Sequence, residues 1–323
     1  MAGDCPDRMD RPEAIVQNTL KSAASFDGFG LHSGAAVRMT VQPAPADFGI
    51  GFLRTDVTGG AAMVPARWDT VVPSRLCTLV ANADGVSVST IEHLMAALAG
   101  LGVHNALIEI DGPEVPILDG SAVPFVAGIM ARGLQALSAP VRAIRVLKSV
   151  EVRDGEALAR LDPADMLEID FSIAFPEPAI GHQGLRLNMA NGAFVRELSD
   201  SRTFCLQADV DRMRAGGLAR GGTLDNAVVF DGGRVLTPGG LRHGDEPVRH
   251  KMLDAMGDLA LAGAPLLARY TGVRAGHAMT NRLLRTLFAT PGAFVIDTCG
   301  SSTKGKLPGV GVRAADLPFL ASV

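Results

Sequence analysis

Three residues spaced by four along one segment offer the clearest chemistry in this sequence. His250, Asp254 and Asp258 lie in the stretch EPVRHKMLDAMGDLA, residues 246–260. If this stretch is helical, the spacing places the three side chains on one face, one turn above another. An imidazole and a carboxylate four residues apart can hold one metal ion between them. The second carboxylate then remains available to orient a neighbouring group.

Two further segments can complete a catalytic site. Glu92 and His93 open an expected helix, and His277 follows Gly276 at the start of another. Two histidines and one aspartate leave one coordination position open, which is typical of catalytic rather than structural zinc. Zinc lowers the pKa of its water toward neutrality, and Glu92 could take the proton as general base. A His277 held protonated by Asp258 could stabilise an oxyanion and protonate a leaving amine.

Each of these residues also fits a purely structural role. Ser89 and Glu92 have the spacing of a capping box, in which Glu92 would only satisfy the helix N-terminus. His93 could be a core histidine on an apolar helix. A histidine and an aspartate at i and i+4, such as His250 and Asp254, also occur as a plain surface pair. The residues alone do not show that the segments meet in space.

Composition describes a globular chain with no attraction to polyanions. The 323 residues are 47% hydrophobic and 20% charged, with a net charge of −4. Nucleic-acid binders usually carry a basic face, so we expect no nucleic-acid partner. Four cysteines, Cys5, Cys77, Cys205 and Cys299, are scattered without a CxxC pair. They favour reduced thiols in a cytoplasmic protein over a disulfide framework or zinc knuckle.

No segment is predicted to enter a membrane. The polar, acidic residues 1–14 lack the apolar core of a signal peptide and are expected to form a flexible tail. A membrane span needs about 20 apolar residues. The longest apolar stretches, 94–103 and 259–268, are short, are broken by Gly or Pro, and are expected to be buried helices or helix ends.

The order of the expected elements predicts an α+β protein. Strands are expected at residues 37–41, 86–89, 106–110, 144–152, 167–173, 227–230 and 294–297. Helices are expected at residues 91–100, 122–132, 206–214, along the segment with Pro247 in its first turn, and at 275–288. Strands followed by a pair of helices, and then the same again, indicate two α+β domains rather than an alternating Rossmann chain. Residues 138–142 are the expected boundary, giving domains at 15–140 and 141–323.

Several long strings resemble the zinc-dependent UDP-3-O-acyl-N-acetylglucosamine deacetylases of lipid A (lipopolysaccharide) biosynthesis. The resemblance extends from about residue 17 to about residue 306. It rests on GFGLHSG (28–34), STIEHL (89–94), ALAGLG (97–102), PILDGS (116–121), SRTF (201–204), GGTLDN (221–226), DEPVRHKMLD (245–254) and the Gly276-His277 pair. It implies two similar α/β-sandwich domains with the active site between them, and a small βαβ insertion at about residues 205–229.

The resemblance also implies a role for each site residue. In the family pattern, His93, His250 and Asp254 bind Zn²⁺ and Glu92 is the general base. His277 is the electrostatic catalyst or general acid, and Asp258 supports it. Thr203 matches a residue that helps bind the oxyanion, whereas Phe204 and Lys251 match positions that contact substrate.

The reaction implied is hydrolysis of the 2-acetamido group of an acylated UDP-sugar, a small-molecule substrate, with release of acetate. The apolar stripe Leu206, Val210 and Met213 would either line the acyl channel or be ordinary helix core. The alternative function is a non-catalytic UDP-sugar-binding homologue. A metalloprotease is disfavoured because the sequence has no H-E-x-x-H helix. We expect a monomer without stable membrane insertion, and the ligand set accepts either Zn²⁺ or Fe²⁺.

Overall fold

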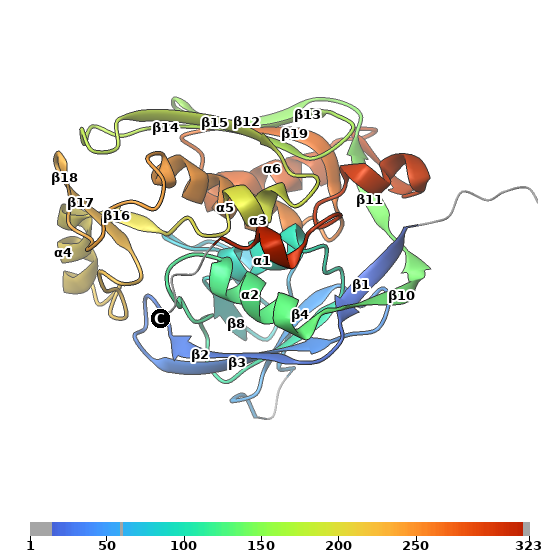
Figure 1. Cartoon of the computed structure of the whole chain (residues 1–323), viewed down its shortest axis with the longest axis horizontal. Helices are drawn as coiled ribbons and strands as arrows, with labels where there is room; N and C mark the ends of the chain where they lie inside the picture. The colour runs from blue at the N-terminus through green and yellow to red at the C-terminus, as the bar shows by residue number, and fades with distance from the viewer. Residues whose placement is uncertain (1–14, 59–60, 319–323) are drawn as a thin grey trace, which may run out of the picture.

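Helices lie between two layers of β-sheet, as Figure 1 shows. The structure is a computed structural model and describes residues 15–58 and 61–318. The tail expected at residues 1–14 lies outside the described residues. Helices and strands are gathered into separate layers rather than alternating along one parallel sheet. The predicted α+β class is therefore confirmed.

The layer built from the N-terminal half contains three small sheets. Alternating buried and exposed residues, as in β3, show that one face of the five-stranded sheet is turned to the core. That sheet has the order β2-β3-β9-β4-β5, from β2 (Ala24–Phe29), β3 (Ala36–Pro43), β4 (Ile50–Arg54), β5 (Met63–Pro65) and β9 (Ala106–Ile110). Beside it are β6 (Val71–Val72), β7 (Leu79–Ala81) and β8 (Ser87–Ser89), and β1 (Val16–Leu20) pairs with β10 (Leu134–Pro140).

The second layer is a seven-stranded sheet from the C-terminal half. Its strands are β11 (Arg142–Val146), β12 (Val150–Asp154), β13 (Ala157–Pro163), β14 (Glu168–Ala174), β15 (His182–Asn188), β19 (Leu266–Val273) and β20 (Phe294–Thr298). The single strand predicted at residues 144–152 is wrong, because residues 147–149 separate β11 from β12. The apolar stretch 259–268, expected to be a buried helix or a helix end, holds the end of a helix at Ala260 and enters β19 at Leu266; β19 pairs with β11, β13 and β14.

The helices that fill the space between the layers include the two that carry the expected site. They are α1 (Glu92–Gly100), α2 (Val123–Arg132), α3 (Ala193–Glu197), α5 (Glu246–Ala260) and α6 (His277–Ala289), with short 3₁₀ helices at Ser301–Lys306 and Ala314–Asp316. Helices α1 and α5 pack against each other through Gly257. A Cβ built there would lie 2.0 Å from the carbonyl oxygen of Glu92, so a side chain would force the helices apart.

A small βαβ unit stands at one end of the molecule (Figure 1). It consists of β16 (Phe204–Leu206), α4 (Gln207–Ala215) and β17 (Val228–Asp231), with β16 and β17 parallel, and β18 (Arg234–Val235) extends its sheet. It occupies the segment for which the insertion was predicted. Helix α4 buries none of its residues, unlike α1, in which only Ala99 is not buried.

Every sheet described here is built from strands on one side of residue 140. The division into domains at residues 15–140 and 141–323 agrees with this pairing and stays a prediction. Within the described parts of the chain, no helix has both the length and the apolar sequence that crossing a membrane requires.

Candidate metal centre and active site

His93, His250 and Asp254 meet between α1 and α5. One ligand atom from each side chain lies within 4.8 Å of the other two, and all three residues are buried. The Asp254 Oδ1 atom is 3.3 Å from His250 Nε2 and 3.6 Å from His93 Nε2. Helical spacing places His250 and Asp254 on one face of α5, and the close α1–α5 packing brings His93 opposite them. The structure thus unites the three residues predicted as ligands.

The surroundings of this cluster suit a cation. Among the residues that the structure describes, the buried Asp254 Oδ1 has no hydrogen-bond partner, which is costly unless a ligand satisfies it. His250 Nδ1 lies 3.0 Å from the carbonyl oxygen of Ser201, so this nitrogen donates and Nε2 is left to bind a metal. Burial lowers the pKa of His250 to about 4, which keeps the imidazole in the neutral form that metal binding requires.

Glu92 is turned toward the cluster and does not cap its helix. Helix α1 has Ile91 at its N-cap and no side-chain cap hydrogen bond. The Glu92 carboxylate instead accepts a hydrogen bond from the backbone N–H of Thr78 at 3.0 Å, and its other oxygen is 3.8 Å from His277 Nε2. Burial raises the pKa of Glu92. The capping-box interpretation is therefore wrong, and the carboxylate is available for proton transfer.

His277 is held by a buried hydrogen-bonded chain. Its Nδ1 lies 2.8 Å from Asp258 Oδ2, and Asp258 Oδ1 accepts a hydrogen bond from the Thr78 hydroxyl at 2.5 Å. Burial alone would lower the pKa of His277, but the carboxylates of Asp258 and Glu92 outweigh it and raise the pKa to about 9. The imidazole is consequently protonated at neutral pH, with Nε2 directed toward Glu92 and Asp254.

Lys251 adds positive charge beside the cluster. Its Nζ donates a hydrogen bond to Asp254 Oδ2 at 2.8 Å. Burial alone would raise the pKa of Asp254, but His250 and Lys251 hold it well below its usual value. Asp254 is therefore ionised at neutral pH, as a carboxyl group that binds a metal must be.

The segment 201–204 reaches the same place from the C-terminal half. The backbone N–H of Thr203 donates a hydrogen bond to the carbonyl oxygen of Gly120, in the N-terminal half, at 2.8 Å. The ring of Phe204 is 6.2 Å from that of His250, centroid to centroid. Thr203 and Phe204, predicted to contact oxyanion and substrate, both line the cavity described below.

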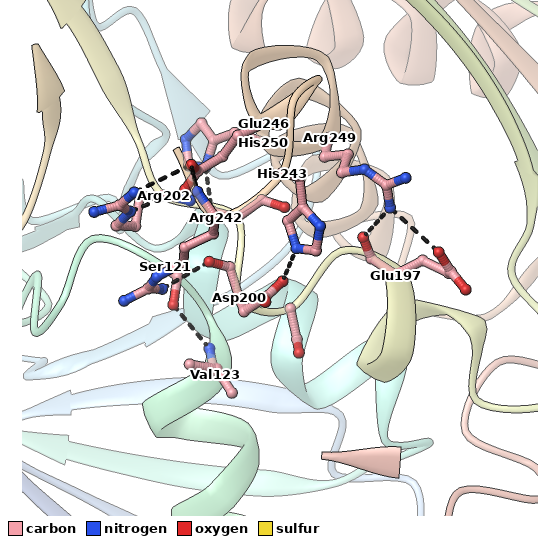
Figure 2. A network of polar contacts seen from close by, with 12 residues as sticks. Ser121, Val123, Glu197, Asp200, Arg202, Arg242, His243, Glu246, Arg249 and His250 are labelled. Carbon is pink, nitrogen blue, oxygen red and sulfur yellow. Dashed lines mark hydrogen bonds and ion pairs between the residues drawn. The ribbon is translucent and has the colours of Figure 1, made fainter. Parts of the chain in front are cut away.

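A buried ion pair fixes the Ser201 carbonyl on which His250 rests. The carboxylate of Glu246, one turn before His250 in α5, accepts hydrogen bonds from the Arg202 backbone N–H and Nε, each at 2.9 Å. Figure 2 shows this pair beside His250, with Arg242 and Arg249 in the same network. Because Arg202 is tied to α5 at both backbone and side chain, the preceding carbonyl is held against the His250 ring.

A cavity of about 1010 Å³ connects the cluster to the βαβ unit. All three ligand residues, together with Glu92, Lys251 and His277, face it. Leu206, Val210 and Met213 line its far part, and all three are only half-buried. The stripe, in which Leu206 ends β16 and Val210 and Met213 belong to α4, is therefore a cavity wall and not helix core.

Sequence reasoning missed Thr78, Glu246 and Arg202. Thr78 is bonded to both Glu92 and Asp258, yet it lies in a loop with no spacing signal. Arg202 and Glu246 are 44 residues apart, and only the fold shows that they form a buried pair. The signal available was the charge of Arg202 within the otherwise apolar and small string SRTF.

Comparison with known proteins gives one consistent result. The family model described as UDP-3-O-acyl N-acetylglycosamine deacetylase matches residues 17–289. A UDP-3-O-acyl-N-acetylglucosamine deacetylase of Phenylobacterium zucineum (strain HLK1) is 51% identical over 284 residues, which is 88% of this chain and 97% of the relative. Proteins of the same name from Anaeromyxobacter sp. (strain Fw109-5) and Shewanella violacea are 49% and 44% identical, covering 85% and 87% of this chain and 90% and 92% of the relatives. With most of both lengths aligned, this chain belongs to the UDP-3-O-acyl N-acetylglycosamine deacetylase family.

Proposed function

We propose that this protein hydrolyses the 2-acetamido group of UDP-3-O-acyl-N-acetylglucosamine in lipid A biosynthesis. The observation that carries the proposal is the meeting of His93, His250 and Asp254 with Glu92 and His277 at one end of a large cavity. Amide hydrolysis needs an activated water, an oxyanion site and a proton for the departing nitrogen. The residues around this cluster can supply each of the three.

His93, His250 and Asp254 would hold Zn²⁺, whose chemistry there is to acidify water and polarise the amide carbonyl. Glu92 takes a proton from the attacking water as that oxygen bonds to the carbonyl carbon. The hydroxyl of Thr203 assists the resulting oxyanion, together with protonated His277. Collapse breaks the C–N bond, and either His277 or Glu92 gives the proton that completes the amine.

The remaining cavity suits an acylated nucleotide-sugar. Lys251 and Phe204 line it beside the cluster, where they would contact the sugar and diphosphate side of the substrate. Farther away the wall is formed by Leu206, Val210 and Met213, which would receive the fatty acyl chain. Charged residues of α4, Asp209, Arg212 and Arg214, also line the cavity. The apolar side chains of this wall and the charged groups of the cluster thus match the two chemically different parts of such a molecule.

The same proposal includes the setting in which the enzyme works. We place it in the cytoplasm, in agreement with the scattered cysteines, and we expect it to be a monomer. Zn²⁺ is the proposed resident ion, with Fe²⁺ as the alternative that the ligand set also accepts.

The test is acetate release from UDP-3-O-acyl-N-acetylglucosamine by chelator-treated protein, before and after one equivalent of Zn²⁺. We expect activity only after metal is returned, and a loss of about 10²–10⁴-fold in Glu92→Ala at unchanged metal content. Binding of the UDP-sugar without acetate release in the wild type would show a non-catalytic homologue. Full activity in Glu92→Ala would remove Glu92 from the mechanism.

A further inference from the structure

Glu114 is a buried carboxylate where three segments meet, outside the reacting groups. It is 3% exposed and accepts hydrogen bonds from the backbone N–H groups of His32 and Ser33, at 2.8 and 2.9 Å. Its Oε1 also accepts the Thr90 hydroxyl at 3.1 Å. Within residues 15–58 and 61–318, no lysine or arginine forms an ion pair with it. A buried carboxylate without a cation depends on such hydrogen bonds, so these three bonds hold its neighbours firmly.

The first of these neighbours is the turn of residues 30–34, which we name the docking turn. Gly30 must lack a side chain because a Cβ there would lie 2.2 Å from the Glu114 carboxylate. Helix α4 and the loop after it, residues 207–224 of the βαβ unit, are named the βαβ segment. The carbonyls of Leu31 and His32 in the docking turn accept hydrogen bonds from the backbone of this segment. The donors are the N–H groups of Gly221, at 3.1 Å, and Arg220, at 3.3 Å.

The βαβ segment meets the docking turn backbone to backbone. A Cβ on Gly221 would lie 2.2 Å from the carbonyl oxygen of Gly30, so the approach is possible only with glycine. Helix α4 buries none of its own residues and has little other packing to hold it in place. Leu31 and His32 line the same cavity as Leu218. We call the part of the cavity proposed to receive the acyl chain its acyl end. The wall of the acyl end is therefore formed by both the docking turn and the βαβ segment.

The third bond of Glu114 reaches the start of the catalytic helix. Thr90 has φ +57°, an unfavourable conformation for a β-branched residue, and is buried two residues before Glu92. Its hydroxyl bond to Glu114 stabilises this conformation. The same carboxylate thus fixes the entry to α1 and the docking turn.

We propose that Glu114 is a positioning residue that sets the acyl-chain capacity of the cavity by holding the docking turn against the βαβ segment. The inference rests on the proposed deacetylase function, which supplies the acyl substrate. Glu114 contacts neither substrate nor reacting atoms and acts through the docking turn. Through Thr90 it ties the same wall to the helix that carries Glu92 and His93.

The experiment compares Glu114→Gln with the wild type on two substrates, a long-chain 3-O-acyl UDP-sugar and its 3-O-acetyl analogue. The carboxamide keeps one acceptor oxygen and places an NH₂ donor at the other position, so one of the two backbone N–H groups loses its acceptor and the docking turn should loosen. We expect KM to rise about tenfold or more for the long-chain substrate and less than about threefold for the analogue. Amide hydrogen exchange across residues 207–224 should become faster. Glu109→Gln is the matched control. It makes the same change from carboxylate to carboxamide at a half-buried position in β9, away from the docking turn.

Gly221→Ala tests the same contact from the other side and leaves Glu114 in place. It should give the same chain-length-dependent rise in KM. This variant therefore tests the contact even if Glu114→Gln does not fold. An equal change in KM for both substrates, or unchanged hydrogen exchange in both variants, would overturn the proposal. If the wild type releases no acetate, the proposed function fails, while the exchange measurement still decides whether Glu114 holds the βαβ segment.

Discussion

The two ends of the cavity are built in opposite ways. At the metal end, α1 and α5 approach each other closely at Gly257, and all three ligand residues are buried. At the acyl end, α4 has no buried residue and its apolar side chains face the cavity. The first end is over-determined by packing, whereas the second depends on a few backbone contacts with the docking turn.

The contrast follows from what each end does. Proton transfer demands donors and acceptors held within a few tenths of an ångström, which only rigid elements supply. An acyl chain is bound by non-directional apolar contact, which tolerates small displacements. We therefore expect substitutions at the metal end to change kcat or metal affinity, and substitutions at the acyl end to change KM.

The largest effect expected is that of Asp258→Asn, which removes the charge that keeps His277 protonated. A raised pKa means that the imidazolium persists from the ordinary value of 6.5 up to about 9 and is lost above that pH. A bound cation would lower this limit somewhat. The kcat of the variant should fall about 10²-fold or more. In a plot of kcat against pH, the decrease on the alkaline side (the alkaline limb) should move to lower pH.

A pH–rate profile of kcat for the metal-loaded wild type and Asp258→Asn measures this shift. Thr78→Ser, which keeps the hydroxyl bond to Asp258, is the control and should retain the wild-type limb. An unchanged alkaline limb in Asp258→Asn would assign that limb to another group.

Arg202→Lys should weaken metal binding without touching a ligand. Lysine preserves the charge opposite Glu246 and the bond from the backbone N–H, but it cannot make the paired guanidinium bonds from Nε and Nη2 that help to fix the Ser201 carbonyl. Metal affinity should fall by about 10-fold to 100-fold, as for other groups that orient a ligating histidine. Competition with a chelating dye measures it.

Arg249→Lys is the matched control in the same network. Arg249 pairs with Asp245 and, as Figure 2 shows, with Glu197, rather than with Glu246. Equal affinities in the two variants would show that the Arg202–Glu246 pair serves stability alone.

Gly257→Ala should break the contact on which the metal end depends. The added methyl would meet the backbone of Glu92 at 2.0 Å, so the helices must separate. Overpacking of this kind costs about 1–3 kcal/mol in the free energy of unfolding. Urea denaturation checks it against Gly233→Ala, where a Cβ meets no atom within 4 Å. Equal stability would mean that α1 and α5 can move apart freely.

Val210→Ala probes the acyl end and should have the smallest effect. The substitution removes two methyl groups from a half-buried position in the cavity wall. Full burial of one methylene contributes about 0.8 kcal/mol of binding free energy, and partial burial contributes less. KM for the long-chain substrate should rise only severalfold, with kcat and the free energy of unfolding nearly unchanged. Val210→Ala itself raises helix propensity. Ala208→Gly, at an exposed position of α4, is therefore the control in which helix propensity changes without loss of a cavity-lining side chain. A fall in kcat instead would contradict the division between the two ends.

Much of the site could be predicted because helical spacing is a local property. The interval of four residues along α5 fixed which face His250, Asp254 and Asp258 share. Helices α1, α2, α4, α5 and α6 were also predicted closely, helped by end signals such as Pro247 and Gly100, whereas the short α3 was not predicted. The strands were harder, because the break at residues 147–149 and the start of β19 at Leu266 depend on pairing partners far along the chain.

The sequence by itself determined the residue types, their helical phase and the family to which they belong. Only the tertiary structure decided that Glu92 faces the cluster instead of capping α1, and that the α4 stripe lines a cavity. It also revealed the Arg202–Glu246 pair and the three bonds of Glu114. The hydrogen bonds of Glu92, Glu246 and Glu114 join residues 14 to 82 positions apart. Such contacts leave no periodic trace in the sequence, because they arise only when separate elements pack.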